Sequence, residues 1–210
     1  MTIGVFDSGS GGRNILEVLE WSFPEFDFVY ISDTKNLPYG LKSAELIREL
    51  VSKAVKPLVE KCSVVIIACN TATTAAIEHL RAEFPSTKFI GLEPMLKPAA
   101  RLTQTGAICV CATPATLRSR NYSQLKHKYT RELKVIEPDC ADWAGLIERG
   151  ETDKINLETL REIIRVSSCD VLVLGCTHYH VLKTRLQKLL PKIKILEPSD
   201  AIVEQLKNLL

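Results

Sequence analysis

The hydrophobic pattern alternates between short apolar runs and longer segments with helical periodicity. Eight runs are almost continuously apolar, over residues 3–6, 28–31, 64–68, 89–92, 107–112, 133–137, 171–175 and 193–197. Strands of a parallel sheet are covered on both faces, and so their apolar positions are continuous rather than alternating. The pattern therefore predicts eight buried strands.

The segments between these runs predict helices. They cover residues 12–22, 43–61, 71–84, 95–104, 114–130, 141–149, 157–167, 178–190 and 199–209. Ser43, Thr71 and Ser199 stand where helix N-caps are expected, because their side-chain oxygens can accept hydrogen bonds from free backbone amides. Regular alternation of strand and helix predicts an α/β fold.

The two halves of the chain resemble each other. The matching segments are IGVFDS (3–8) with ICVCAT (108–113), VYISD (29–33) with VIEPD (135–139), and VVIIACNT (64–71) with VLVLGCTH (171–178). The nearly constant offset predicts two similar, doubly wound parallel-sheet α/β domains related by pseudo-symmetry, over residues 1–93 and 94–198. We expect an active site in the cleft between them and a final helix, about 199–210, that packs back on the first domain. Chance similarity among valine-rich strands is the alternative.

Composition and charge exclude several classes of protein. The 210 residues include 46% hydrophobic and 25% charged residues, with a net charge of +2, so we expect no nucleic-acid partner. The densest basic stretch, 117–131, is predicted to be a solvated helix face. No apolar run approaches the roughly 20 residues of a membrane span, and no signal peptide opens the chain. These features predict a cytoplasmic protein without a membrane partner.

Seven cysteines lie at positions 62, 69, 109, 111, 140, 169 and 176. An odd count without a signal peptide argues against a disulfide framework. Most of them are expected to act as small buried hydrophobic residues.

Two of the cysteines occupy equivalent polar contexts. Each predicted strand ends in a small residue and is followed by a cysteine, giving Ala68-Cys69-Asn70-Thr71 and Gly175-Cys176-Thr177-His178. Ligands of parallel α/β sheets gather at the carboxyl ends of the strands, where helix N-termini offer free amides. Two thiols facing each other across a cleft suit stereoinversion, in which one removes a proton and the other delivers one to the opposite face. Asp7 and His178 are expected to tune these thiols.

The opening stretch DSGSGGRN looks at first like a phosphate-binding loop. However, no Lys-Ser or Lys-Thr pair follows the glycines, Asn14 replaces the third glycine of a dinucleotide fingerprint, and Asp7 would repel a phosphate. We therefore interpret the loop as one wall of an amino-acid cleft. Its glycines would let backbone amides approach a small substrate, and Asp7 would be the partner of Cys69.

Four ordered motifs, IGVFDSGSGG, ISDTKNLPYG, IIACNTATTA and VLGCTHY, resemble those of the glutamate racemases within the aspartate/glutamate racemase superfamily. The resemblance covers nearly the whole chain. It implies cofactor-independent interconversion of L-glutamate and D-glutamate, supplying D-glutamate for peptidoglycan, and a homodimer. Because the chain begins directly at its first strand, we expect it to lack the leading extension of relatives activated by a cell-wall precursor.

The resemblance also assigns residues. Cys69 would act on the D-enantiomer and Cys176 on the L-enantiomer, assisted by Asp7, His178 and Glu148. The implied substrate-binding residues are Asp7, Ser8, Pro38, Tyr39, Gly40, Asn70, Thr71, Thr113, Thr116, Thr177 and His178.

Three alternatives stay open. A racemase or isomerase of the same superfamily acting on aspartate, hydantoins or maleate would share these motifs. The C-x-H-x-H spacing of Cys176, His178 and His180, where the family usually has proline at the last position, would suit a zinc-dependent hydrolase. A binding module could use the cleft only to hold an amino acid, although binding alone does not require two thiols.

Overall fold

The computed structural model describes residues 1–210 and contains two four-stranded parallel sheets. The strands are β1 (Thr2–Asp7), β2 (Asp27–Ser32), β3 (Val64–Ile67), β4 (Lys88–Gly91), β5 (Ala107–Ala112), β6 (Lys134–Ile136), β7 (Val171–Gly175) and β8 (Lys194–Leu196). Their order is β2-β1-β3-β4 in one sheet and β6-β5-β7-β8 in the other, so both sheets share one topology. The eight predicted strands and the α/β fold are confirmed.

Helices cover both faces of the first sheet. One face packs against α2 (Ala44–Val59) and α3 (Asn70–Glu83), in a core that includes Phe6, Val65 and Ile67. The other face packs against α1 (Arg13–Ser22) and α10 (Ser199–Leu209), in a core that includes Val5 and Ile66. Successive strand residues thus bury opposite faces, which explains the continuous apolar runs.

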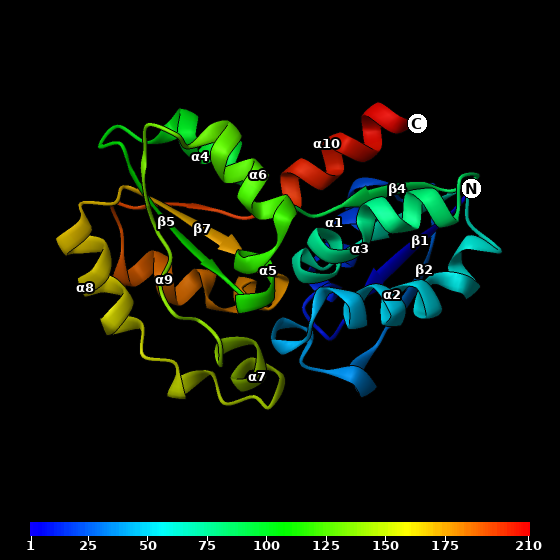
Figure 1. The fold of residues 1–210 in the computed structure, drawn as a ribbon, viewed down its shortest axis with the longest axis horizontal. Helices are drawn as coiled ribbons and strands as arrows, with labels where there is room; N and C mark the ends of the chain where they lie inside the picture. Colours follow the sequence, from blue (N-terminus) through cyan, green and yellow to red (C-terminus); the bar gives the residue numbers. More distant parts are fainter.

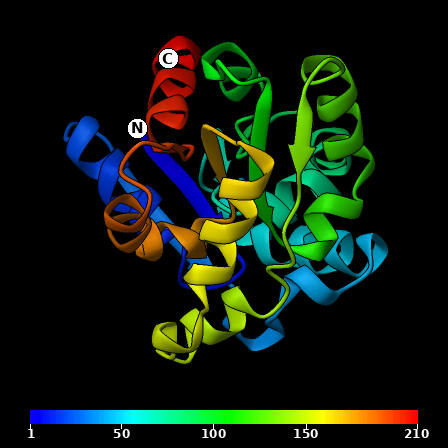
Figure 2. The same cartoon turned by 90° about the vertical axis from the view of Figure 1, so that its left-hand side faces the viewer.

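The second sheet is covered in the same way (Figure 2). Its helices are α4 (Leu96–Leu102), α5 (Pro114–Arg118), α6 (Arg120–Tyr129), α7 (Trp143–Glu148), α8 (Leu157–Ser167) and α9 (Lys183–Leu189). One core joins β5 and β7 to α4 and α6, and the other joins them to α7, α8 and α9. Four 3₁₀ turns complete the chain: η1 (Thr34–Asn36), η2 (Tyr39–Leu41), η3 (Thr152–Lys154) and η4 (Thr177–Leu182).

The structure corrects several helix predictions. The helix expected over 114–130 is divided at Ser119, whose side chain caps α6 by accepting from the amide of Tyr122. The helix expected over 178–190 begins as the 3₁₀ turn η4. Ser43 caps α2 as predicted, but Thr71 and Ser199 are not caps, because each lies inside its helix.

The C-terminal helix α10 returns from the second sheet to the first. It contacts α1 and β4, beside the N-terminus of the chain (Figure 1). The chain therefore crosses between the two halves twice, after β4 and again after β8. The domain limits at residues 93 and 198 stay a prediction.

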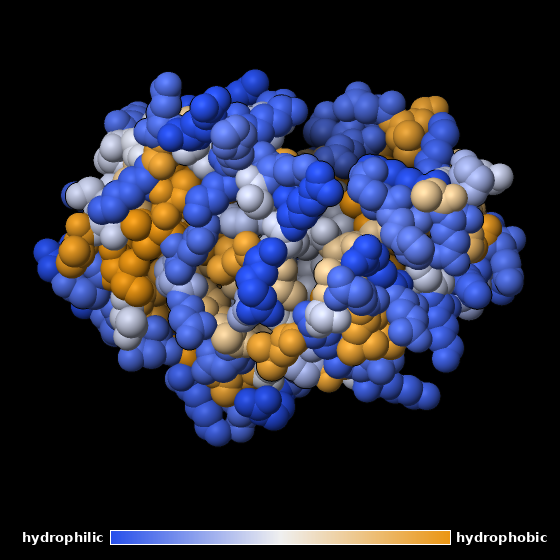
Figure 3. All heavy atoms as spheres, viewed as in Figure 1, coloured by the Kyte–Doolittle hydropathy of each residue, from blue (hydrophilic) through white to orange (hydrophobic).

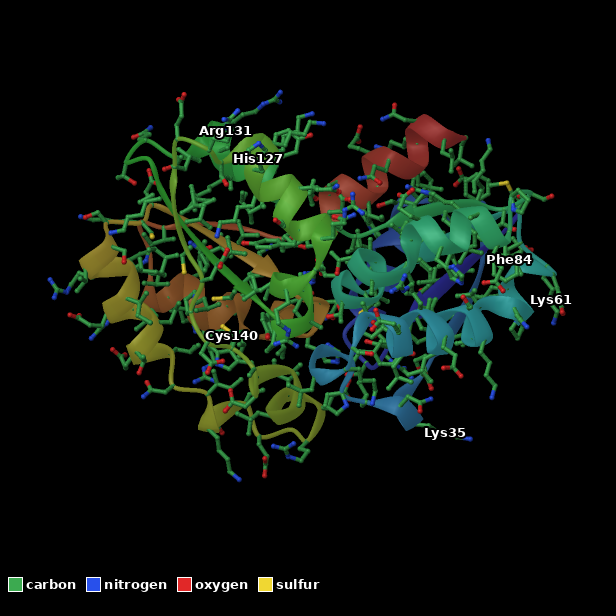
Figure 4. All side chains as sticks on the ribbon, in the orientation of Figure 1. Lys35, Lys61, Phe84, His127, Arg131 and Cys140 are labelled. Carbon is green, nitrogen blue, oxygen red and sulfur yellow. The ribbon has the colours of Figure 1, made fainter.

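On the face of the molecule in Figure 3, hydrophilic side chains dominate, and apolar ones form several patches, the most extended of them on the left, over the second half. No helix has the length and apolarity required to cross a membrane. Basic residues of the 117–131 stretch, including Arg118, Arg120 and Lys128, are exposed. His127 and Arg131 lie at the outer end of α6 (Figure 4), so the predicted solvated helix face is confirmed.

Candidate active site

A cavity of about 240 Å³ lies between the two halves. This volume is below the roughly 300–1,000 Å³ typical of drug-sized ligand pockets and suits a small metabolite. Ten of the predicted site residues line it: Ser8, Pro38, Tyr39, Gly40, Cys69, Thr71, Thr113, Glu148, Cys176 and His178. The structure therefore brings together both cysteines and both polar segments that the sequence singled out.

Four predicted residues lie behind the cavity wall rather than on it. These are Asp7, Asn70, Thr116 and Thr177, all of which are buried. Both side-chain atoms of Asn70 and the hydroxyl of Thr177 have no hydrogen-bond partner. Buried polar groups are normally satisfied, so these two residues, each next to one of the cysteines, hold unused hydrogen-bonding groups directly behind the cavity wall.

Cys69 follows β3 and is the N-cap of α3. Its Sγ accepts a hydrogen bond from the amide of Ala72 at 3.3 Å and lies 3.1 Å from the hydroxyl of Ser8. Burial and, to a smaller extent, the nearby charge of Asp7 together raise the pKa of Cys69 to about 12, against these two hydrogen bonds. Cys69 is therefore held as a protonated thiol.

Asp7 makes no hydrogen bond to Cys69 and acts on it through its charge, which contributes to the raised pKa of that thiol. One carboxylate oxygen of Asp7 accepts from the amides of Gly9 and Gly12, at 3.1 and 2.8 Å, while its other oxygen is buried without a partner. Burial raises the pKa of Asp7, whereas His178 and these amides oppose the shift. Ser8 is the side chain that contacts the thiol directly.

The second thiol has a different set of neighbours. Cys176 follows β7 at the start of η4, and its Sγ lies 3.7 Å from Nδ1 of His178. Nε2 of His178 contacts a carboxylate oxygen of Glu148 at 2.5 Å. Burial lowers the pKa of His178, but its hydrogen bonds to Cys176 and Glu148 outweigh burial and raise that pKa to about 10. Cys176 therefore faces an imidazolium.

Glu148 is held as the anion of this pair. Its hydrogen bond to His178 lowers the pKa of Glu148 to about 2, against burial and with help from the amide of Ser10. Ser10 donates that amide hydrogen at 2.7 Å from the opposite half of the molecule. Glu148 thus joins the glycine loop of the first half to the cysteine turn of the second.

The glycines of the first loop serve close packing rather than substrate contact. A Cβ at Gly11 would lie 2.5 Å from the backbone nitrogen of His178, and one at Gly9 would meet Glu148. The amides of Gly9, Ser10 and Gly12 already donate within the protein. None of Gly9, Gly11 and Gly12 lines the cavity, and the expectation that their amides approach the substrate stays a prediction.

Three threonine hydroxyls form a closed ring, with Thr71 and Thr113 on the cavity wall and Thr116 behind it. Thr71 lies 2.8 Å from Thr113 and 3.2 Å from Thr116, and the last two lie 3.0 Å apart. Thr71 belongs to the first half and the other two belong to the second. Gly40 lets η2 approach the ring, because a Cβ there would lie 2.8 Å from that of Thr113.

The side chains named for a zinc site do not converge. No group of three His, Cys, Asp or Glu side chains is arranged to hold a metal ion. His180 turns away from the cavity and lies 3.4 Å from Glu197, beyond the end of β8. The C-x-H-x-H spacing therefore gives no metal-binding geometry.

Sequence reasoning missed Arg149, Leu37, Leu41 and a small-residue segment that includes Ala141, Ala144 and Gly145, all of which line the cavity. Arg149 directly follows Glu148 in GLIERG, and this adjacency was the available signal. Ala141 lies just before α7 and Ala144 and Gly145 lie in its first turn, and such small apolar side chains give no sequence signal for a cavity wall.

Comparison with known proteins places these features in a family. The model of the Asp/Glu/hydantoin racemases matches residues 13–206. A glutamate racemase of Ectopseudomonas mendocina (strain ymp) is 36% identical, over 99% of this chain and 81% of the relative. The Escherichia coli glutamate racemase structure with L-glutamate and the activator UDP-MurNAc-ala is 30% identical, with a TM-score of 0.86 over 98% of this chain and 80% of that one. The Francisella tularensis glutamate racemase structure with D-glutamate is 30% identical, with a TM-score of 0.83 over 100% and 80%.

Proposed function

The chain belongs to the Asp/Glu/hydantoin racemase family, and we propose that it interconverts L-glutamate and D-glutamate by proton transfer between two cysteines. The names of its relatives support glutamate as the substrate. The observation that carries the two-base mechanism is the presence of Cys69 and Cys176 in one cavity, each contributed by a different half. A substrate between them presents one face of its α-carbon to each sulfur.

In the L-to-D direction, the Cys176 thiolate removes the α-proton and the Cys69 thiol donates its proton to the opposite face. In the reverse direction the two sulfurs exchange roles. The high pKa of Cys69 suits the donor step, because it keeps the proton on sulfur until the carbanion forms. The imidazolium of His178 supplies a hydrogen-bond donor beside the other sulfur.

The difficult step is the formation of a carbanion next to a carboxylate. Donors placed in advance around that carboxylate stabilise the charge that develops as the proton leaves. The hydroxyls of Thr71 and Thr113 line the cavity and would hold it by exchanging hydrogen bonds within the threonine ring for bonds to the substrate, supported from behind the wall by Thr116 and Asn70. No step of this scheme requires an electron-accepting cofactor.

The proposal also covers the biological role of the product, the oligomeric state and the remaining site residues. D-glutamate made in this way would supply peptidoglycan synthesis in the cytoplasm, and the enzyme would act as a homodimer. Asp7 would assist at the Cys69 face and Glu148, through His178, at the Cys176 face. Ser8, Pro38, Tyr39 and Gly40 would complete the substrate-binding wall.

The test is a racemisation assay in heavy water with the wild-type protein. Two-base transfer puts one solvent deuterium on the α-carbon of the product, while recovered substrate keeps its protium at early times. Deuterium in recovered substrate at the same rate as in product would overturn the two-base mechanism. Turnover of aspartate but not glutamate would overturn the substrate assignment.

A further inference from the structure

Arg149 is the only lysine or arginine among the residues that line the cavity. It is the first residue after α7, next to Glu148 in the chain. The other charged groups on the wall are Glu148 and His178, which form an ion pair with each other. Arg149 is therefore the one positive charge on the wall that has no negative partner within the cavity.

The guanidinium of Arg149 is held at one point and free elsewhere. Its Nε donates to Glu151 at 2.9 Å, and Glu151 also accepts from Lys154 at 2.8 Å. Arginine carries five N–H donors, and no hydrogen bond engages those on the two Nη atoms of Arg149. The fork that binds a carboxylate in two places is thus open.

Gly145 determines where this fork lies. A Cβ at that position would be 3.3 Å from Nη1 of Arg149, so the guanidinium folds back against α7 where a side chain would otherwise stand. Gly145 itself lines the cavity. The side chain of Arg149 is 59% exposed, so its free end lies along the cavity edge, at the boundary between the cavity and solvent.

Glutamate brings two carboxylates and one ammonium group into this space. The threonine ring is uncharged and suits the α-carboxylate, which the ammonium group partly balances. The distal carboxylate has no counter-charge of its own and needs a cation. Guanidinium groups bind carboxylates through paired, charge-assisted hydrogen bonds.

We propose that Arg149 is a specificity-determining residue that binds the distal carboxylate of the substrate through its two Nη atoms. This inference rests on the proposed function and adds the group that selects an acidic side chain. Glu151 positions the guanidinium through Nε. Arg149 takes no part in proton transfer.

The experiment compares Arg149→Gln with Lys154→Gln. Both variants remove one positive charge next to Glu151, but Lys154 does not line the cavity. For Arg149→Gln we expect KM for both glutamate enantiomers to rise about 10- to 100-fold, with kcat changed less than about threefold. Lys154→Gln should leave KM within about twofold, since exposed surface pairs contribute little. Arg149→Lys should recover part of the lost affinity.

A second measurement separates charge recognition from folding. Inhibition by D-glutamine, which is neutral at the distal position, should be nearly unchanged in Arg149→Gln, because that variant lacks only the carboxylate contact. An unchanged KM for glutamate, or a loss in kcat at constant KM, would overturn the inference. A wild-type protein that does not racemise glutamate would refute the proposed function, and D-glutamate binding by calorimetry to wild type and Arg149→Gln would then test Arg149 alone.

Discussion

The two cysteine turns occupy the same place in two sheets of identical strand order, yet their surroundings differ. Cys69 caps a regular α-helix with its own sulfur and touches a neutral hydroxyl. Cys176 begins a 3₁₀ turn, caps nothing, and faces the His178–Glu148 ion pair. The backbone repeat thus places two thiols, while their neighbours make the two half-sites chemically unequal.

This difference suits a reaction between mirror-image substrates. The substrates of a racemase differ only in configuration, but the cavity has a thiol held protonated on one side and a cation beside the thiol on the other. Two-base proton transfer starts with one sulfur protonated and the other deprotonated. Two thiols in identical surroundings would not favour either arrangement. Here burial and the charge of Asp7 keep the proton on Cys69, and the imidazolium of His178 stands beside Cys176.

Replacing each cysteine in turn is the largest test of this comparison. Cys69→Ala and Cys176→Ala should each lower racemisation by at least about 10³-fold, because each removes one of two required proton carriers. In heavy water, Cys69→Ala should still exchange the α-proton of L-glutamate slowly, and Cys176→Ala that of D-glutamate. Nuclear magnetic resonance of each enantiomer measures the exchange.

The buried cysteine Cys62 provides the control, since it lies in the core of the first half, outside the cavity. Cys62→Ala should keep racemase activity within a few-fold of the wild-type value. If both cavity variants exchanged the same enantiomer, the assignment of one face to each sulfur would be wrong.

Glu148→Gln should produce the next largest effect, and only on the second half-site. The substitution removes the anion that helps hold the pKa of His178 near 10, so burial should lower that pKa. We expect kcat at pH 8 to fall about 10- to 100-fold and the alkaline limb of the pH profile to begin at lower pH. Glu197→Gln, which alters the other His–Glu pair of this half, should leave the profile in place.

The same pair also makes stability depend on pH. Because the folded-state pKa of His178 is raised from 6.5 to about 10, its stabilising contribution is complete below about pH 6.5 and is lost as the pH rises toward 10. Urea unfolding should therefore show a decline in the free energy of unfolding over this range. The decline should be smaller in Glu148→Gln, and an equal decline in both proteins would refute the ion pair.

The sequence predicted the fold well, since strands buried on both faces leave an unmistakable apolar signature. All eight strands were found from that signature, and the repeat of VVIIACNT in VLVLGCTH anticipated two sheets of one topology. The helix caps were less predictable. Cys69 caps α3 although Thr71 is the better capping residue, because the chain turns two residues earlier to place the sulfur at the sheet edge.

Only those site residues that lie within the sequence motifs were predicted. Residues adjacent to the strand ends, such as Ser8 and Thr71, were identified because parallel strands gather their carboxyl ends. The packing role of the loop glycines was not predicted, since their contacts with Glu148 and His178 cross between halves and depend on tertiary packing. Arg149 was missed because its position depends on Gly145 and Glu151 together.

Ser8→Ala should have the smallest effect and sharpens the comparison on the first half-site. The Ser8 hydroxyl lies 3.1 Å from Cys69 and partly offsets the rise in the pKa of that thiol. Its loss should make the Cys69 thiolate harder to form, and therefore slow proton removal from D-glutamate by about three- to tenfold. In the L-to-D direction, the Cys69 thiol protonates the carbanion in the final step, and this step should be affected less. Initial-rate deuterium exchange into each enantiomer measures the two directions separately.

The control is Ser10→Ala, because Ser10 lies in the same loop but is exposed. An equal loss of exchange from both enantiomers would mean that Ser8 contacts the substrate rather than the thiol.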